Sequence, residues 1–432
     1  MKDAIVRLIR KIIPESIVRV AENIYRSTRA FVVNLGYGFP AKGLKIIGIT
    51  GTNGKTTTCN YVNEILKANG LKTAMFTTAV IEMNGKCSPN ELNRTVPLTA
   101  QLFAFFKEAK RQNVDWVVME VTAHAIDQHK FDFVPFEVVA VTNLTQDHLD
   151  YFETMNKYAS VKSRLLEKKN KAVVLNIDDQ WFDFFYGKSS GKQVLTFGEN
   201  KNAMVRLEKL NPSIASTKFT VVDTSASRHE ISTSLIGEFN AFNAINAYAV
   251  GLALQIPEKT IVNGLQNLHS VPGRMEKIEE GQNFVVIVDY AHTTDAIEKV
   301  LGSLKSLGAK KIRLVFGATG DRDKAKRPDM GIVAGKYADE IYLTDDEPYY
   351  ESPESIRSEV MGGIKKVNAE KKTREIGSRR EAISAAINDA EKNDVVVITG
   401  MGHEKFRMVS GKKEPWDERQ IVRQAVKKRL GK

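Results

Sequence analysis

The sequence lacks several features that would place the protein in a specialised class. Its 432 residues include only two cysteines, Cys59 and Cys87, and no CxxC pair, which argues for a reducing compartment and against a structural zinc site. The sequence contains no stretch of about 20 apolar residues, which is the length that a membrane-spanning helix needs. The N-terminus also has no apolar block followed by a cleavage site, as a signal peptide has. We therefore expect a cytoplasmic protein.

Long basic runs and low-complexity tracts are absent as well. The net charge of +11, from 63 basic and 52 acidic residues, suits an anionic partner, and nucleotides or acidic sugars satisfy that surplus without nucleic acid. We expect no nucleic-acid partner. A composition with 42% hydrophobic and 27% charged residues is typical of a globular protein, and the length suggests two to three domains.

A phosphate-loop motif is the first feature that points to chemistry. The stretch "GITGTNGKTTTCNYV" (48–62) resembles the end of a strand, a glycine turn and the start of a helix. Gly54-Lys55-Thr56 fits the pattern G-x-x-x-x-G-K-[ST], although Ile49 stands where that pattern has its first glycine. Amides at a helix N-terminus bind phosphate, a lysine adds charge and a threonine hydroxyl can ligate magnesium. The motif predicts a nucleotide site made of Gly51, Thr52, Asn53, Gly54, Lys55, Thr56 and Thr57.

Apolar runs alternate with helical patterns over most of the chain. The expected strands are 43–50, 115–121, 136–144 and 171–179, then 283–291, 311–319, 339–346 and 393–402. Such alternation predicts an α/β fold with parallel sheets and ligands at the carboxyl ends of the strands. We expect a short helical N-terminal segment (1–42), a central P-loop parallel-sheet ATPase domain (43–271) and a C-terminal Rossmann-like α/β domain (272–432), with a hinge at 269–277.

Residues 1–34 combine apolar positions at helical spacing with basic residues, and Pro14 interrupts the pattern. Two interpretations stay open. The segment could be a pair of helices lying on a membrane surface, or a helical hairpin packed on the main body, which we favour.

Titratable residues follow the expected strands. Glu120 closes an apolar strand, where a carboxylate is costly unless a cation meets it, so beside a phosphate loop it is a good magnesium ligand. The stretch "TNLTQDHLDYF" (142–152) groups Asn143, Asp147, His148 and Asp150 after another strand. From spacing alone, Lys162 is only a lysine on a helix.

Nine motifs occur in order and together carry a family resemblance. They are G-T-N-G-K-T-T, E-V-T-A-H-A, T-N-L-T-Q-D-H-L-D-Y, Y-x-x-V-K, G-E-F-N-A-F-N, V-P-G-R-M-E, V-D-Y-A-H-T, G-D-R-D-K-A-K-R-P and G-M-G-H-E. From residue 44 to about 425 the chain resembles the Mur ligases of peptidoglycan synthesis, most closely the MurE type. The resemblance implies an ATP-dependent amide ligase that uses ATP and Mg2+. A carboxylate of a muramyl-dipeptide substrate would become an acyl phosphate, and an amino acid would then attack it.

The same resemblance implies roles for individual residues. Lys55, Glu120, His148 and Lys162 would be catalytic. Thr56, Glu120, His148 and a carbamylated Lys162 would hold metal. Asn243, Arg274, Asp289 and His292 would join the phosphate loop in binding ATP. The substrate side would comprise Thr95, Thr122, His124, Lys130, Arg322, Asp346, Tyr349, Gly400, His403 and Glu404.

The chain departs from the family pattern at several places. Only 47 residues precede Gly48, where MurE-type enzymes usually carry a UDP-sugar domain, so the acceptor could be UDP-linked or lipid-linked. "DDEPYY" (345–350) places Tyr349 where diaminopimelate-adding members have an arginine, and Glu347 where they have an asparagine. The negative charge added by Glu347 would repel a carboxylate and favour an amine, so we expect lysine over diaminopimelate. Met401 stands where a lysine is frequent.

Other functions fit the sequence less well. A folylpolyglutamate synthase-like glutamate ligase would have G-K-G-S and D-G-A-H-N motifs, a MurT-like amidotransferase partner would have four zinc-binding cysteines, and a non-catalytic scaffold would not need Lys55, Glu120, His148 and Lys162 together. A Mur-like ligase for a lipid-linked or non-muramyl acceptor stays an alternative. No segment indicates an oligomer interface, so we expect a monomer.

Overall fold

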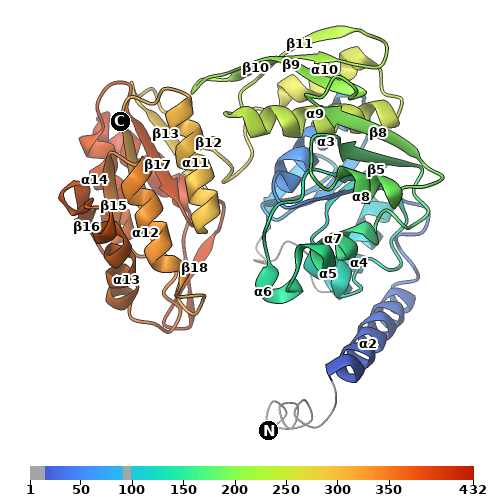
Figure 1. Ribbon diagram of the computed structural model, residues 1–432, viewed down its shortest axis with the longest axis horizontal. Helices are drawn as coiled ribbons and strands as arrows, with labels where there is room; N and C mark the ends of the chain where they lie inside the picture. Colours follow the sequence, from blue (N-terminus) through green and yellow to red (C-terminus); the bar gives the residue numbers. More distant parts are fainter. Residues whose placement is uncertain (1–14, 91–98) are drawn as a thin grey trace.

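The computed structural model describes residues 15–90 and 99–432, which form two α/β bodies side by side and one projecting helix (Figure 1). The expected α/β fold with parallel sheets is confirmed. Each of the eight predicted strands has a counterpart, and each sheet carries apolar clusters on both faces.

The first body is built on an eleven-stranded sheet in the order β11-β10-β9-β8-β7-β6-β1-β5-β2-β3-β4. The strands from β9 to β2 in this order are parallel, and antiparallel strands extend both edges. The strands are β1 (Lys45–Thr50), β2 (Thr73–Phe76), β3 (Val80–Met83), β4 (Lys86–Pro89), β5 (Trp116–Glu120), β6 (Phe136–Val141), β7 (Ala172–Asn176), β8 (Gln193–Gly198), β9 (Val205–Pro212), β10 (Thr217–Val222) and β11 (Arg228–Thr233).

Helices cover both faces of this sheet. α3 (Lys55–Ala68), α9 (Glu238–Ala253) and α10 (Glu258–Asn267) bury apolar side chains with one face. α4 (Thr99–Arg111), α5 (Ala123–Asp127), α6 (Leu149–Phe152), α7 (Met155–Ser163) and α8 (Phe182–Gly187) contribute to the opposite cluster. Because β1 and β5 are buried on both faces, they read as unbroken apolar runs in the sequence.

The second body has a six-stranded sheet in the order β12-β13-β17-β14-β15-β16, parallel except for β12. Its strands are β12 (Glu276–Lys277), β13 (Val285–Asp289), β14 (Ile312–Phe316), β15 (Glu340–Leu343), β16 (Thr373–Glu375) and β17 (Val395–Thr399). Its helices are α11 (Thr294–Ser306), α12 (Lys326–Tyr337), α13 (Pro353–Lys366), the 3-10 turn η1 (Glu370–Lys372), α14 (Arg379–Asp389) and α15 (Glu418–Arg429). A separate hairpin pairs β18 (Phe406–Val409) with β19 (Lys412–Pro415).

The helix α2 (Glu15–Gly36) begins directly after Pro14 and projects from the first body (Figure 1). Its attachment to the first body is both polar and apolar. Ser27 Oγ donates to Asp132 Oδ2 at 3.2 Å, Arg26 lies 3.7 Å from Asp127, and the ring of Phe31 lies 5.6 Å from that of Phe133. The expected packing on the main body is therefore limited to one side of this helix. The first helix of the expected pair falls in residues 1–14, outside the described residues. No described helix is long and apolar enough to cross a membrane.

Candidate active site

The phosphate-loop motif forms a tight turn between β1 and α3. Gly51 and Gly54 have φ values of 142° and 83°, in the region that favours glycine. A Cβ atom on Gly51 would lie 1.9 Å from Thr142 Oγ1, and one on Gly54 would lie 2.1 Å from Asn243 Oδ1. Both positions therefore require glycine on two grounds, conformation and space.

The loop that follows β6 fixes the shape of this turn. Thr52 N donates to Asn143 O at 2.9 Å, and Asn53 N donates to the side chain of Asn143 at 3.0 Å. In return, Thr142 Oγ1 donates to Asn53 O at 2.6 Å. The loop after β6 thus pairs the amides of Thr52 and Asn53 and the carbonyl of Asn53, and it holds this part of the turn before any ligand arrives.

A hydroxyl, a carboxylate and an amine converge on this turn. Thr56 Oγ1 donates to Glu120 Oε2 at 2.8 Å, and the same oxygen accepts the backbone N–H of Thr78 at 2.9 Å. Lys55 Nζ donates to Thr52 O at 2.7 Å. Burial lowers the pKa of Lys55, while nearby Glu120 opposes the shift.

Lys162 lies on the opposite side of the same turn. Its Nζ donates to Gly51 O at 2.7 Å and sits 4.6 Å above the ring of Tyr158. The side chain is fully buried, and burial, followed by the positive charge of Lys55, lowers the pKa of Lys162 well below its ordinary value. Spacing alone does not single out this lysine, but the fold brings it to the phosphate loop.

His148 lies with the first-body residues that the sequence predicts for substrate binding. Its ring makes an edge contact with His124 at 4.6 Å between centroids and lies 6.2 Å from the ring of Tyr158. Thr122 caps the N-terminus of α5, the helix that carries His124. Lys130 follows that helix in a turn, and its backbone N–H bonds to Ala125 O. Thr95 lies outside the described residues.

The second-body residues predicted to bind nucleotide gather around Arg274. Its guanidinium stacks on Tyr290 at 5.2 Å, and its buried Nε has no protein partner. Asp289 accepts the N–H groups of Met275 and Ala291, which ties the hinge segment 269–277 to the end of β13. Burial raises the pKa of Asp289, and His292, also buried, has a lowered pKa. Asn243 faces the phosphate loop from α9.

Three carboxylic acids cluster at the carboxyl ends of β15 and β17. Burial, reinforced by Asp346, raises the pKa of Glu347 to about 7. Burial, reinforced by Glu347, raises the pKa of Glu404 to about 8. Tyr290 donates a hydrogen bond of 3.0 Å to Glu404. Asp346 is also buried with a raised pKa.

The other second-body residues predicted to bind substrate border this cluster. The guanidinium of Arg322 lies 5.7 Å from the ring of Tyr349. Gly400 has a φ of 118°, and a Cβ there would lie 2.3 Å from an oxygen of Asp346. His403 bridges to the first body, where its Nε2 is 3.2 Å from Thr78 O. The second body thus presents an acidic site toward the phosphate loop.

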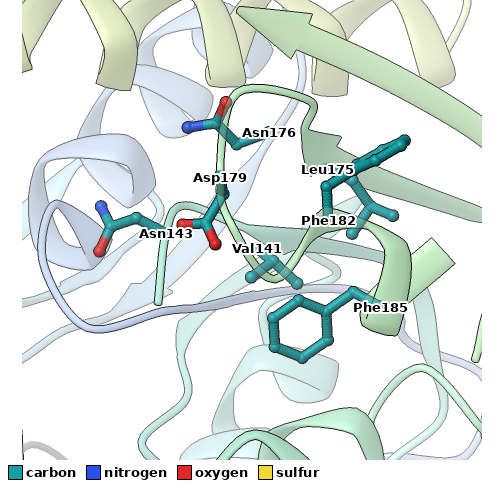
Figure 2. Close-up of a pocket in the computed structure, with 7 residues that line it drawn as sticks. All are labelled: Val141, Asn143, Leu175, Asn176, Asp179, Phe182 and Phe185. Carbon is teal, nitrogen blue, oxygen red and sulfur yellow. The ribbon is translucent and has the colours of Figure 1, made fainter. Parts of the chain in front are cut away.

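A small pocket lies beside the loop that follows β6. Figure 2 shows the polar side chains of Asn143, Asn176 and Asp179 on one side and the rings of Phe182 and Phe185 on the other. The cavity measures about 180 Å³ even with the open space at its mouth. Ligand sites generally span about 300–1,000 Å³, so we do not assign a substrate to it.

Sequence reasoning missed several residues that organise the site. The backbone N–H of Thr78 donates to Glu120. Tyr290 contacts both Arg274 and Glu404. Arg379 pairs with Glu418 and also interacts with the charge of Asp346. Tyr290 stands inside the motif "VDYAHT" and could have been noted there. The other contacts join residues far apart in the chain, and no local sequence pattern predicts them.

A glycine turn at a strand end, with a lysine, a hydroxyl and a carboxylate around it, defines a nucleoside-triphosphate-binding fold. The comparisons with known proteins are more specific. Residues 49–251 match the "Mur ligase middle domain" and residues 273–402 match the "Mur ligase, glutamate ligase domain". The chain belongs to the Mur ligase family, whose members are ATP-dependent ligases.

Relatives with assigned names agree with the MurE-type resemblance. The "UDP-N-acetylmuramoyl-L-alanyl-D-glutamate--2,6-diaminopimelate ligase" of Caldanaerobacter subterraneus subsp. tengcongensis is 39% identical over 401 residues, covering 93% of this chain and 82% of the relative. A solved structure with the same protein name is 30% identical, with a TM-score of 0.67 over 90% of this chain and 79% of that one.

The fold is also shared with a ligase of different specificity. The Mycobacterium tuberculosis folylpolyglutamate synthase complexed with ADP and AMPPCP has a TM-score of 0.70 over 96% of this chain and 99% of that one. At 18% identity this likeness concerns the fold alone. The MurE-type relatives therefore carry the functional argument.

Proposed function

We propose that the protein is an ATP-dependent ligase that joins an amino acid to the glutamate carboxylate of a muramoyl-L-Ala-D-Glu precursor in peptidoglycan synthesis. The observation that carries the proposal is the convergence of a phosphate loop, Lys55, Thr56, Glu120 and Lys162 on one sheet edge, opposite an acidic site on the second body. The names of the relatives support the choice of substrates.

The reaction has two steps. A substrate carboxylate oxygen attacks the γ-phosphorus of ATP, the bond to ADP breaks, and an acyl phosphate forms. The neutral amine of the incoming amino acid then attacks the acyl carbon, loses a proton and expels inorganic phosphate. Phosphoryl transfer depends mainly on alignment and on neutralising charge. The amides at the start of α3, from Gly54 to Thr57, and Lys55 would bind the phosphates, and Gly51, Thr52 and Asn53 would shape the turn around them. Asn243, Arg274, Asp289 and His292 would complete the ATP site.

The donor set around Thr56 fits magnesium. The Thr56 hydroxyl and the Glu120 carboxylate are 2.8 Å apart, and oxygen donors of these types are those that Mg2+ prefers. When bound, the ion would neutralise charge on the phosphates. His148 and Lys162 would complete its surroundings. Lys162 could do so only as a carbamate, whose oxygen can bind a cation, as an ammonium group cannot. The carbamate forms from CO2 and a neutral amine, and burial favours the neutral form of this lysine.

The two substrates would bind on opposite bodies. Thr122, His124, Lys130 and Thr95 would hold the muramyl dipeptide. Asp346, Tyr349, Gly400, His403, Glu404 and Arg322 would hold the amino acid. The carboxylate cluster supports a side chain that ends in an ammonium group, which both diaminopimelate, named for the relatives, and lysine possess. The preference for lysine stays a prediction. The proposed domain bounds are 1–42 for the N-terminal segment, 43–271 for the ATP-binding domain and 272–432 for the C-terminal domain. We propose that the protein is a cytoplasmic monomer.

Product mass tests this proposal directly. The protein would receive ATP, magnesium, bicarbonate, and UDP-linked or lipid-linked muramoyl-L-Ala-D-Glu, with lysine and diaminopimelate together. We expect a tripeptide whose mass identifies the amino acid, and no product from Lys162→Ala. Lys157→Ala, which removes an exposed lysine on the same helix, is the matched control and should retain activity. If ADP and product fail to form with both acceptors, the proposed substrates are wrong.

We also propose that α2 contacts an anionic lipid surface. Its attached side includes Ser27, Ala30 and Asn34, and the ring of Phe31 packs 5.6 Å from that of Phe133. Its free side is mainly apolar, and the exposed apolar residues there are Val20, Ile24, Tyr25, Val32 and Leu35. Residues 1–34 contain seven Lys and Arg against three Asp and Glu. An apolar stripe in a basic segment suits insertion at the headgroups of anionic lipids.

Vesicle sedimentation would test this surface. We expect binding to phosphatidylglycerol vesicles, weaker binding to phosphatidylcholine vesicles, and loss of both in an Ile24→Ser, Leu35→Ser protein. Tyr186→Ser, at an exposed apolar residue of α8, is the control and should bind normally. Equal sedimentation of all proteins would refute the contact. Self-association that the double substitution abolishes would assign the stripe to a second copy instead, against the expected monomer.

A further inference from the structure

His403 of the second body forms a hydrogen bond with a backbone carbonyl of the first body. The residue lies in the loop after β17 and is 6% exposed, with its Nε2 3.2 Å from Thr78 O in the turn between β2 and β3. Burial, together with the neighbouring Arg274, lowers the pKa of His403 to about 3. The ring is therefore neutral, and because a carbonyl only accepts, Nε2 carries the hydrogen.

The same residue of the first body holds the Glu120 carboxylate. Thr78 N donates to Glu120 Oε2 at 2.9 Å, and that oxygen also accepts Thr56 Oγ1 at 2.8 Å. The N–H and the carbonyl of Thr78 belong to the two peptide groups that flank one α-carbon. Hydrogen bonds between Thr77 and Val80 close the turn around Thr78, so a shift of this turn that moves the carbonyl also moves the N–H that fixes Glu120.

Residues of the acidic site surround the other end of this connection. The ring of His403 packs 4.8 Å from the ring of Tyr290. Tyr290 donates to Glu404 and stacks on Arg274. His403 thus stands between the acidic site of the second body and the carboxylate that faces the phosphate loop of the first.

We propose that His403 is a positioning residue that couples docking of the second body to the orientation of Glu120. This inference rests on the proposed function in one respect, the assignment of Glu120 as a magnesium ligand. The hydrogen bond to Thr78 O forms only when the second body is docked. It then holds the turn around Thr78 so that the N–H of Thr78 keeps Glu120 facing Thr56. A purely structural His403 would stack on Tyr290 without affecting the metal site.

Nucleotide binding without turnover separates these two roles. Calorimetry would measure the binding of a non-hydrolysable ATP analogue to the full chain over a series of Mg2+ concentrations. In glutamine, Nε2 is as many bonds from Cα as Nε2 of histidine, whereas asparagine reaches only the Nδ1 position. We expect His403→Ala and His403→Asn to raise the Mg2+ concentration needed for half-maximal binding roughly fivefold, the effect of one hydrogen bond. His403→Gln should stay within about twofold of the unaltered protein.

The controls distinguish failure of the coupling from failure of the proposed function. Glu120→Gln should raise the Mg2+ concentration needed for half-maximal binding more than any other substitution. Binding of the analogue without Mg2+ should be similar in all proteins. If Glu120→Gln has no effect, the magnesium assignment itself is wrong. If Glu120→Gln has its effect but His403→Ala matches the unaltered protein, or His403→Gln is as impaired as His403→Ala, the coupling alone is refuted.

Discussion

The buried pair of Arg379 and Glu418 allows a prediction that combines stability and function. Both side chains are 0% exposed. Arg379 Nε donates to Glu418 Oε2 at 3.0 Å, its Nη2 donates to Thr399 O at 2.8 Å, and Trp416 Nε1 donates to Glu418 at 2.9 Å. Glu418→Gln keeps the shape of the side chain but leaves the guanidinium without its partner charge.

The expected loss of stability is large because the remaining charge stays buried. Removing one partner of a buried pair generally costs about 3–5 kcal/mol. Glu414→Gln is the matched control, since Glu414 pairs with Arg407 in the same body but is 46% exposed, and such pairs contribute below about 1 kcal/mol. The difference between the two substitutions is therefore at least about 2 kcal/mol.

Urea unfolding followed by Trp416 fluorescence would measure these free energies at the site. Replacing Trp116 and Trp181 by phenylalanine in every protein leaves Trp416 as the only tryptophan of the three in the chain. A loss of less than about 1 kcal/mol in Glu418→Gln, equal to that of the control, would refute the reasoning. In folded Glu418→Gln protein, Asp346 is the nearest remaining anion for Arg379. We therefore also expect a raised KM for the amino acid.

Three further predictions concern the acidic site, helix packing and the phosphate loop. The pKa of Glu404 is raised to about 8, so its carboxyl is uncharged below that pH. The KM for an ammonium-ended amino acid should fall as pH rises from about 6 to 8, and Glu404→Gln should reduce that fall to the part contributed by Glu347, whose pKa is raised to about 7. Gly264→Ala should cost about 1–3 kcal/mol in urea unfolding, because its Cβ would lie 2.4 Å from Ile65 Cα, whereas Gly362→Ala meets open space and should be neutral or stabilising. Gly54→Ala should abolish nucleotide binding in calorimetry, since it combines a φ of 83° with a blocked Cβ position; normal affinity would contradict the assigned loop geometry.

The sequence allowed prediction of the features that depend on local patterns. β1 and β5 are short apolar runs closed by Thr50 and Glu120, and the turn between β1 and α3 needs glycines that the motif displays. Residues of these kinds read as strand ends and turns without tertiary information. The two parallel sheets followed from the same alternation.

The antiparallel edge of the first sheet was missed for a physical reason. β11 has exposed or half-exposed side chains at four of its six positions, and it contains no apolar run to mark it. The β18–β19 hairpin is likewise largely exposed. Such strands are defined by their pairing partners, so their sequence pattern is weak.

The roles of individual site residues depend on contacts that no spacing reveals. Lys162 becomes a buried amine beside Gly51 only after α7 packs against the sheet. Thr78 acts through its backbone, for which any residue type would serve. Motif resemblance could point to Lys162 but not to Thr78, because a resemblance records side chains and not the peptide groups that hold them.

The distribution of these residues over two bodies has a consequence for the order of the reaction. Lys55, Thr56, Glu120 and Lys162 belong to the first sheet, whereas Arg274 and Glu404 belong to the second body. An acyl phosphate exposed to water would be lost to hydrolysis, so its formation should await the docked arrangement that brings the amine and excludes water. A contact such as His403 to Thr78, which reaches Glu120 through one residue, would make the phosphoryl-transfer site complete only in that arrangement. Docking would then limit the formation of the intermediate as well as its consumption.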